Sequence, residues 1–346
     1  MDSFTRSESN IAPSLRNPLI KGRFACHAFT WWSTLSAVKK QREPFIHDRP
    51  AHPFLAEGAL FAAALIWGLS FVLLKSALST WPAHFILAVR FTGAAVLLAV
   101  VFRKRLRAHL RLEYLWRGAL MGVFLFAAFS VQTLGLLTTD PGKNAFLTAI
   151  YCVMVPFLHW AVNRTRPDRY NIAAAFLCIA GVGMVALRPG FGFQVLPGDA
   201  LTLLGGFFFA VHLVAVATYS RGRDPFVLTI LQFAATAVCC WLVWGLFEPA
   251  PTGINIQVVL EVGYLTLFAT AIALLLQSVG QKHTNPAAAA LILSLEAVFG
   301  TAASVLFTDE RMTPVKIAGF LLIFFAVVLS ETKLRFFRRR EAEPLP

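Results

Sequence analysis

Two ionisable side chains lie inside long apolar stretches of the sequence. Arg90 lies eight residues into the stretch 82–102, and Glu296 lies eleven residues into the stretch 285–307. A charge at the centre of a bilayer is unfavourable, so such residues are expected to face the protein interior and to have a partner. The sequence leaves two roles open for each. Arg90 binds an anionic group or neutralises Glu296, and Glu296 is an ion-pair partner or a group that carries a proton.

Seven further side chains with polar or indole groups lie in other apolar stretches. Trp67 is too deep to anchor the protein at a membrane surface, so it faces a cavity or fills space. His212 is a packing residue or contacts a proton or substrate. With the two ionisable residues, these side chains make up the predicted substrate-binding and coupling site: Trp67, Ser70, Arg90, Gln132, Asn144, Tyr151, His212, Gln277 and Glu296.

Ten apolar segments carry these residues. The chain is 57% hydrophobic and 14% charged, whereas soluble domains carry roughly a quarter charged residues. Segments of about 20 apolar residues cross a bilayer as helices, so we predict an all-α polytopic membrane protein with ten transmembrane helices. The expected spans are 55–78, 82–102, 115–137, 142–162, 170–188, 198–219, 225–247, 258–280, 285–307 and 313–332.

Basic residues mark one side of the predicted membrane protein. Lys and Arg in short loops are retained on the cytoplasmic side, and 25 of the 31 basic residues lie in the terminal segments or in alternate loops. We therefore expect a multi-pass protein of the plasma (inner) membrane with both termini in the cytoplasm. The net charge of +13 then reports topology, and no nucleic acid is expected as a partner.

The chain contains an internal repeat. At an offset of 145 residues Gln132 corresponds to Gln277, and Pro141 corresponds to Pro286. Each half has five spans, an odd number, so the second half enters the membrane from the opposite side and the repeats are inverted, as in many secondary transporters. The predicted domains are a basic tail over 1–53, a first repeat over 54–190, a second repeat over 191–332 and a basic tail over 333–346.

The N-terminal segment 1–53 leaves three interpretations open. It is basic and contains no apolar run of 18 residues, so it is a cytoplasmic tail, an interfacial segment or the product of a start codon assigned too far upstream. A cleaved signal peptide is disfavoured, because the segment has no proper apolar region.

Motifs for catalysis and for nucleotide binding are absent from the sequence. There is no HExxH, no Walker A lysine and no metal-binding spacing among the five cysteines. The run from Gly181 to Ala186 matches a dinucleotide fingerprint, but no strand precedes it. We therefore expect no catalytic residue, metal or cofactor.

Three local patterns concern packing. Gly118 and Gly122 form a GxxxG pattern that allows close helix approach, and Pro156 predicts a kink in the fourth span. Asp309, Glu310 and Arg311 end the ninth span, where we expect a solvated cluster.

Several short motifs resemble those of a known family. They are Trp67-Gly68 with Phe71, Pro82 with Arg90-Phe91, and Leu293-Ser294-Leu295-Glu296 followed by Asp309-Glu310-Arg311 and Pro314. In these the chain resembles the drug/metabolite transporter superfamily, specifically the permeases with two EamA repeats. Ala297 follows Glu296 where that family often has proline. The resemblance implies ten helices, cytoplasmic termini and transport, frequently export, of amino acids, metabolites or drugs.

The leading functional hypothesis is a secondary transporter that works by alternating access between the two repeats. Its partners would be a small-molecule substrate and the lipid bilayer, with protons as the candidate coupling ion. The alternatives are an integral-membrane scaffold or receptor, and a membrane enzyme without transport.

Overall fold

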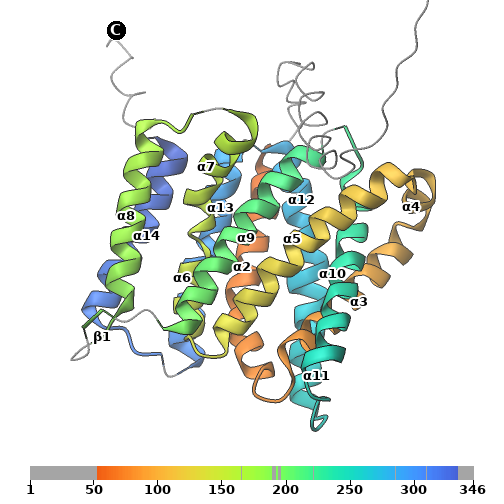
Figure 1. Ribbon diagram of the computed structural model, residues 1–346, viewed down its shortest axis with the longest axis horizontal. Coiled ribbons are helices and arrows are strands. Elements are labelled where there is room, and N and C mark those ends of the chain that lie inside the picture. Colours follow the sequence, from red (N-terminus) through yellow and green to blue (C-terminus); the bar gives the residue numbers. More distant parts are fainter. Residues whose placement is uncertain are drawn as a thin grey trace, which may run out of the picture. The chain divides into compact units, whose positions relative to one another are not determined.

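The structure is a computed structural model that describes residues 53–164, 166–188, 192–193, 196–220, 222–284, 286–308 and 310–333. The predicted N-terminal tail thus lies almost entirely outside the described residues. The regular elements among the described residues are helices and one pair of two-residue antiparallel strands, β1 (Leu187–Arg188) and β2 (Gly192–Phe193), and turns and loops connect them (Figure 1). The helices are α2 (Pro53–Ala77), α3 (Ala83–Val101), α4 (Arg103–His109), α5 (Leu112–Leu136), α6 (Pro141–Thr148), α7 (Tyr151–Asn163), α8 (Arg169–Ala186), α9 (Pro197–Tyr219), α10 (Pro225–Phe247), α11 (Ile256–Tyr264), the π-helical η2 (Leu265–Ile272), α12 (Ala273–His283), α13 (Pro286–Phe307) and α14 (Pro314–Thr332).

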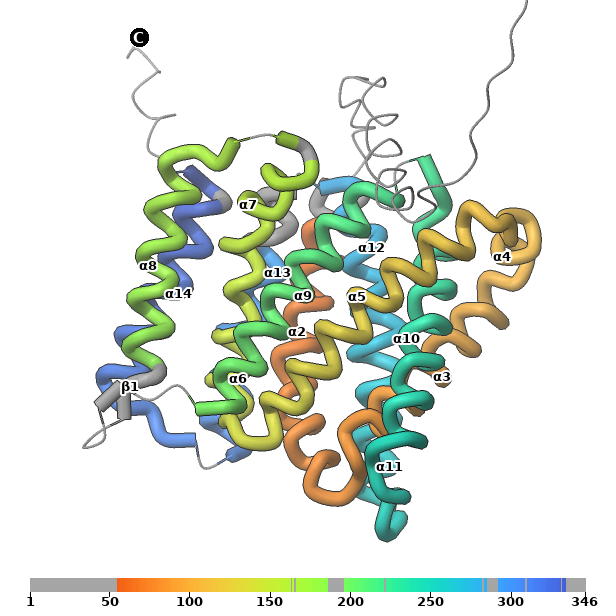
Figure 2. Tube along the Cα trace, in the orientation of Figure 1, coloured from red at the N-terminus to blue at the C-terminus, as the bar shows by residue number. Residues whose placement is uncertain are grey.

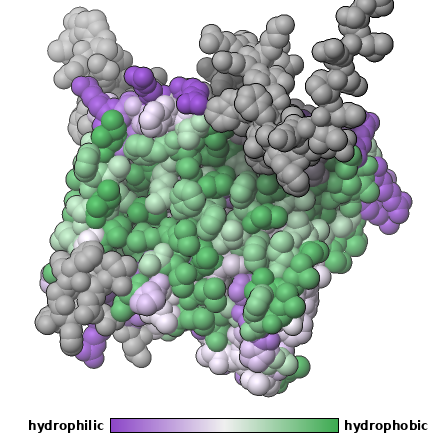
Figure 3. All heavy atoms as spheres, in the orientation of Figure 1, coloured by the Kyte–Doolittle hydropathy of each residue, from purple (hydrophilic) through white to green (hydrophobic). Residues whose placement is uncertain are grey.

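Seven helical segments of the described chain are long and apolar enough to cross a membrane. Two of them are composite, since α6 with α7 and α11 with η2 and α12 each form one segment. Three shorter apolar helices lie within α8, α13 and α14. Apolar side chains cover the face seen in Figure 3, with hydrophilic residues at its two ends. The protein is therefore a helical membrane protein, while the number of ten spans stays a prediction.

Proline and capping side chains fix where several helices begin. Pro197, Pro225 and Pro314 occupy the first turns of α9, α10 and α14, where their missing N–H groups leave no hydrogen bond unmade. Asp224 accepts hydrogen bonds from the backbone N–H groups of Phe226 and Val227, which caps α10. The short loops predicted from the sequence therefore have a local physical basis.

Helices from the two halves of the chain pack against each other in equivalent pairs. α5 lies along α9, and α12 lies along α2 (Figure 2). A Cβ atom added to Gly135 of α5 would lie 2.5 Å from Oγ1 of Thr202, and one added to Gly280 of α12 would lie 2.7 Å from Cγ of Leu60. The two glycines are 145 residues apart in the sequence. Each allows close approach between its own repeat and the first helix of the other.

Glycines also determine two other helix pairs. The predicted GxxxG pattern packs α5 against α10, because Cβ atoms on Gly118 and Gly122 would lie 2.4 Å from Cβ of Leu231 and 2.5 Å from the Gln232 carbonyl oxygen. Gly181, in the run that resembles a dinucleotide fingerprint, lies in α8 and faces the backbone of Gly319 in α14. This run therefore serves helix packing.

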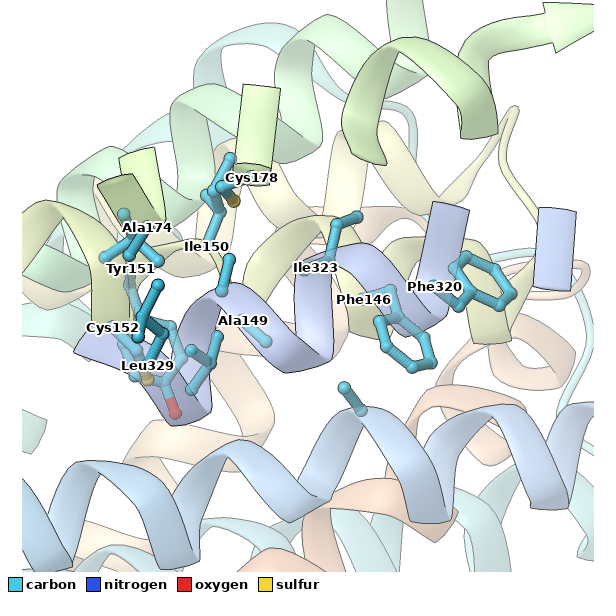
Figure 4. Close-up of a cluster of buried hydrophobic side chains, with 14 of the residues drawn as sticks. Phe146, Ala149, Ile150, Tyr151, Cys152, Ala174, Cys178, Phe320, Ile323 and Leu329 are labelled. Atoms are coloured by element: carbon cyan, nitrogen blue, oxygen red, sulfur yellow. The ribbon is translucent and has the colours of Figure 1, made fainter. Parts of the chain in front are cut away.

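An apolar cluster connects α14 to the helices beside it. The rings of Phe146 and Phe320 stack with centroids 4.1 Å apart, and Figure 4 shows them facing each other. Cys152 and Cys178 are buried in the same cluster and behave as small apolar residues. This cluster joins α6 and α7 of the first half to α14 of the second.

Two membrane-spanning segments depart from regular α-helix. Between α6 and α7, the amide groups of Cys152 and Val153 donate to the carbonyls of Ala149 and Ile150, only three residues back. The segment η2 is instead a π-helix of eight residues. Pro156, where we predict a kink, lies inside α7, and the irregular turn precedes it. Such departures often occur at functional sites.

Candidate functional site

A cavity of about 50 Å³ lies between helices of both halves of the chain. Eight of the nine residues predicted for the site line it, and Asn144 does not. The lining includes both members of two residue pairs that are related by the offset of 145 residues. These pairs are Trp67 with His212 and Gln132 with Gln277. The lining residues are Trp67, Ser70, Phe71, Leu74, Arg90, Leu125, Phe129, Gln132, Thr148, Tyr151, Phe209, His212, Leu213, Leu274, Gln277 and Glu296.

Arg90 brings a guanidinium group to the cavity from α3. The residue is only 2% exposed, and its charged carbon lies 5.3 Å from the centre of the Phe129 ring, at a cation–π distance. Its Nε donates a hydrogen bond of 3.1 Å to the hydroxyl of Thr270. These two contacts fix one edge and one face of the guanidinium group.

The π-helical segment η2 supplies partners to two cavity residues. Besides accepting from Arg90, the Thr270 hydroxyl donates 2.7 Å to the carbonyl of Leu265, five residues earlier. The carbonyl of Ala269 accepts a hydrogen bond of 2.8 Å from the indole N–H of Trp67. The π-helical backbone of η2 thus positions two residues of the cavity wall, Arg90 and Trp67, by hydrogen bonds.

Glu296 is held by a tyrosine instead of an arginine. The hydroxyl of Tyr151, on the first turn of α7, donates a hydrogen bond to the Glu296 carboxyl group. Both residues are buried. Among the described residues no ion pair connects Arg90 with Glu296, although both line the cavity. A direct contact in which Arg90 neutralises Glu296 is therefore not formed among the described residues in this conformation.

Other polar groups at the cavity bond to neighbouring helices. The Gln132 side-chain amide donates 3.0 Å to the hydroxyl of Thr148, beside the irregular turn between α6 and α7. His212 on α9 lies 2.8 Å from Oε1 of Gln232 on α10, through its Nε2 atom. Ser70 donates to the carbonyl of Trp67 in its own helix, at 2.7 Å. These bonds orient the polar part of the cavity wall.

Asn144 lies outside the cavity, in the contact between α6 and α9. Its side-chain amide donates to the hydroxyl of Thr202 at 2.7 Å and to that of Thr139 at 3.2 Å. The residue is completely buried. The sequence predicts Asn144 in the site because it is polar within an apolar stretch. In the structure its side-chain N–H groups donate hydrogen bonds within the contact between α6 and α9.

Buried ionic contacts bind the beginning of α6 to the second half of the chain. Nζ of Lys143 lies 2.6 Å from Oδ2 of Asp199 on α9, and both side chains are almost fully buried. The Glu310 carboxylate accepts a hydrogen bond of 2.9 Å from the backbone N–H of Gly142 and lies 3.2 Å from Nζ of Lys316. The expectation of a solvated cluster is therefore wrong for Glu310, because its side chain is only 1% exposed.

Several contributors to the site were not predicted from the sequence. Phe129 and Phe209 are two of many phenylalanines, and nothing in the sequence distinguishes phenylalanines that line the cavity from those that face lipid. Thr148 and Thr270 were not predicted because threonine is common in apolar helices, so its presence does not indicate a site. The π-helix that orients Thr270 has no recognised sequence signal here.

The described residues contain no group of three His, Cys, Asp or Glu side chains that could hold a metal ion. The arrangement instead joins one guanidinium, one hydrogen-bonded carboxyl group and several amide and hydroxyl groups inside an aromatic wall. The cavity therefore has the concave form and the few polar groups of a small-molecule site, with a cation and a carboxyl group in its wall.

The fold and cavity define a multi-pass helical membrane protein with a polar site at the contact of two similar halves. The EamA-like transporter family matches residues 55–187 and 196–332, and the chain therefore belongs to this family. The predicted resemblance to EamA-type permeases is thereby confirmed.

The similar proteins carry transporter names. An "Uncharacterized transporter" of Archaeoglobus fulgidus is 32% identical over 277 residues, which cover 79% of this chain and 85% of that protein. The "Uncharacterized inner membrane transporter YedA" of Escherichia coli K12 is 24% identical over 278 residues, covering 79% of this chain and 89% of YedA. A solved crystal structure is similar with a TM-score of 0.62 and 19% identity, over 83% of this chain and 99% of that one. This last likeness concerns the fold alone.

Proposed function

We propose that the protein is a secondary transporter that moves a small metabolite, amino acid or drug by alternating access, in the direction of export. The observation that carries the proposal is the cavity itself, whose wall contains equivalent residues from both halves together with buried Arg90 and Glu296. A volume of about 50 Å³ holds only a few waters, at roughly 10–15 Å³ each, so a larger substrate requires the helices to move apart.

The proposed topology has ten spans in two inverted repeats, over 54–190 and 191–332, with basic tails on either side. The three shorter apolar helices would complete the seven longer segments. Reciprocal packing of α5 on α9 and of α12 on α2 supports two halves that exchange roles. The protein would lie in the plasma (inner) membrane, which agrees with the location in the name of YedA. Both of its termini would face the cytoplasm.

Alternating access requires contacts that close one face and break when it opens. The contacts at the start of α6 meet this requirement, because Lys143–Asp199 and Gly142–Glu310 each join the two repeats. On the proposed topology they lie on the outer face. The present conformation would then be closed on that face.

Glu296 is the proposed proton-coupling group. A carboxyl group without a cation partner can exchange a proton when the cavity changes sides, and the Tyr151 hydroxyl would orient it. The lipid bilayer is the remaining partner. No metal or cofactor takes part in this proposal.

Transport assays in proteoliposomes test the proposal. The probes are a panel of labelled amino acids and cationic dyes, with and without an imposed pH gradient, for the wild type and Glu296→Gln. We expect gradient-driven flux for the wild type and only solute exchange for Glu296→Gln. Equal flux of both proteins with and without the gradient would make the protein a facilitator, and no flux of any probe would favour the scaffold or receptor.

A further inference from the structure

The guanidinium group of Arg90 has one edge that its neighbours do not use. Nε is bound to Thr270 and one face lies on Phe129. Within the described part of the chain, the two Nη atoms have no hydrogen bond or ion pair, although the residue is only 2% exposed and lines the cavity. A buried charge is strongly unfavourable without a partner. The unused edge therefore calls for an anionic ligand.

Surrounding residues do not supply that anion. The carboxyl group in the cavity wall, Glu296, is hydrogen-bonded to Tyr151 and not to Arg90. The other described acidic side chains with buried positions are bound elsewhere, such as Asp199 to Lys143 and Glu261 to Ser76. None of the described acidic side chains therefore supplies the anion, which points to a bound ligand.

The geometry of the guanidinium group indicates which anion fits. Two parallel N–H groups match a carboxylate in a bidentate arrangement. Arg90 is the only Lys or Arg among the described lining residues, so a doubly charged phosphate would be left partly uncompensated. The apolar wall formed by Phe71, Phe129 and Phe209 suits the carbon skeleton of a carboxylic acid.

We propose that the free edge of Arg90 binds the carboxylate of the transported solute, and that Thr270 of the π-helix is the positioning residue for this arginine. The inference rests on the proposed function, since it names the substrate class of the same site. Thr270 holds Nε at 3.1 Å and is itself fixed by the carbonyl of Leu265. The π-helix thus turns a hydroxyl toward α3 and aims the free edge into the cavity.

Ligand-induced thermal stabilisation of the purified protein tests the inference without requiring transport. The probes are propionate and its uncharged isostere propionamide, with methyl phosphate as a third anion at matched ionic strength. A ligand that binds only the folded protein raises its unfolding temperature. We expect stabilisation by propionate but not by propionamide or methyl phosphate, and loss of this stabilisation in Arg90→Gln.

Variants of the π-helix keep the test decisive if Arg90→Gln does not fold. Thr270→Val preserves the shape but removes the acceptor of Nε, so propionate affinity should fall by about tenfold. Thr270→Ser should restore it. Thr266→Val is the matched control, because among the described residues the Thr266 hydroxyl bonds only to the carbonyl of Val262, in α11 of the same membrane segment, at 2.7 Å. It should bind propionate like the wild type.

Two results would overturn the inference. The first is equal stabilisation by propionate and propionamide, or by propionate and methyl phosphate. The second is an unchanged propionate affinity in Thr270→Val, which would remove the positioning role. Because the assay measures binding, carboxylate stabilisation without flux would contradict only the transport proposal. Flux of a solute without carboxylate stabilisation would contradict only the inference.

Discussion

Lys143 and Asp199 form an ion pair of 2.6 Å that connects α6 in the first half of the chain to α9 in the second, with side-chain exposures of 9% and 3%. The pair lies next in sequence to Asn144, which also joins α6 to α9, and to Gly198, which packs α9 against the end of α5 and the loop before α6. Asn144 donates to Thr202, and a Cβ atom on Gly198 would lie 2.1 Å from the Thr138 hydroxyl. Charge and close packing therefore hold this part of the first half against α9, which on the proposed mechanism closes the outer end of the cavity.

Removing one partner of this pair should open that end. Lys143→Met leaves Asp199 buried without a cation, a change that costs about 3–5 kcal/mol, whereas Lys143→Met with Asp199→Leu removes both charges. We expect the single variant to lower the unfolding temperature and the double variant to recover most of it. A cysteine introduced at Ser70 should react faster with an impermeant thiol reagent, applied from the Lys143 face, in the single variant.

Arg105→Gln serves as the control for this experiment. Arg105 pairs with Asp224 at 3.4 Å, but its side chain is 52% exposed, so its loss should change stability by less than about 1 kcal/mol. If Lys143→Met behaves like Arg105→Gln in both measurements, the buried pair does not close the cavity.

Glu310 should contribute to the same closure through its charge. Its carboxylate accepts from the Gly142 N–H group and from the Ser304 hydroxyl, and it pairs with Lys316. Glu310→Gln keeps an oxygen acceptor but loses the charge, while Glu310→Ala loses both. We expect a graded increase in thiol reactivity at the Ser70→Cys position, with alanine above glutamine. Equal reactivity of the wild type and Glu310→Ala would contradict this role.

The equivalent glycines Gly135 and Gly280 should both be intolerant of larger residues. A Cβ atom at either position would lie within 3.0 Å of atoms in the neighbouring repeat. Overpacking of this kind typically costs about 1–3 kcal/mol. We expect Gly135→Ala and Gly280→Ala to lower the unfolding temperature in detergent.

Gly245→Ala is the matched control for the two glycines. Gly245 lies within α10, and nothing lies within 4 Å of an added Cβ atom. Alanine favours helix over glycine by about 1 kcal/mol, so this variant should be as stable as the wild type or more stable. Destabilisation of all three variants alike would show that close packing is not the cause.

The sequence identified most of the cavity because burial of polar groups in a membrane is costly and therefore rare. That single rule selected Arg90, His212 and Glu296, which all line the cavity. It also selected Asn144, because burial alone does not distinguish a group that faces a cavity from one that bonds across a helix contact. Hydrogen-bond partners such as Thr202 depend on how helices far apart in the sequence approach each other.

Backbone irregularity was harder to predict than polarity. Pro156 lacks an amide donor and so indicated a kink, yet the tightened turn lies at Ala149 and Ile150. The π-helix η2 has a composition that fits an ordinary apolar helix. Neither irregularity has a local pattern in the sequence that marks its position. The expectation for Glu310 failed for the same reason, because its partner Gly142 is 168 residues away.

The last prediction concerns Asp168, at the start of α8. Its carboxylate accepts from the backbone N–H groups of Tyr170 and Asn171 at 3.0 and 3.1 Å, and it lies 2.6 Å from Nζ of Lys333, after α14. Partial burial raises the pKa of Asp168, but the hydrogen bond with Lys333 and the backbone donors outweigh it, so the pKa lies below its usual 3.8. The stabilisation is therefore present above the unfolded-state pKa and is lost as pH falls through the folded-state pKa.

Asp168→Asn separates the effect of the carboxylate charge from that of the hydrogen bonds that cap α8. Asparagine still accepts from the two N–H groups but does not pair with Lys333, so the variant should be slightly less stable than the wild type near pH 6. The pair is partly exposed, which limits the difference to within about 1 kcal/mol. The difference should shrink below pH 3.8, as the pH falls through the lowered folded-state pKa and the carboxyl of the wild type becomes protonated. A pH series of thermal unfolding in nanodiscs, from pH 6 into acid, measures it, and a difference that persists unchanged in acid would show that the loss does not arise from the carboxylate charge.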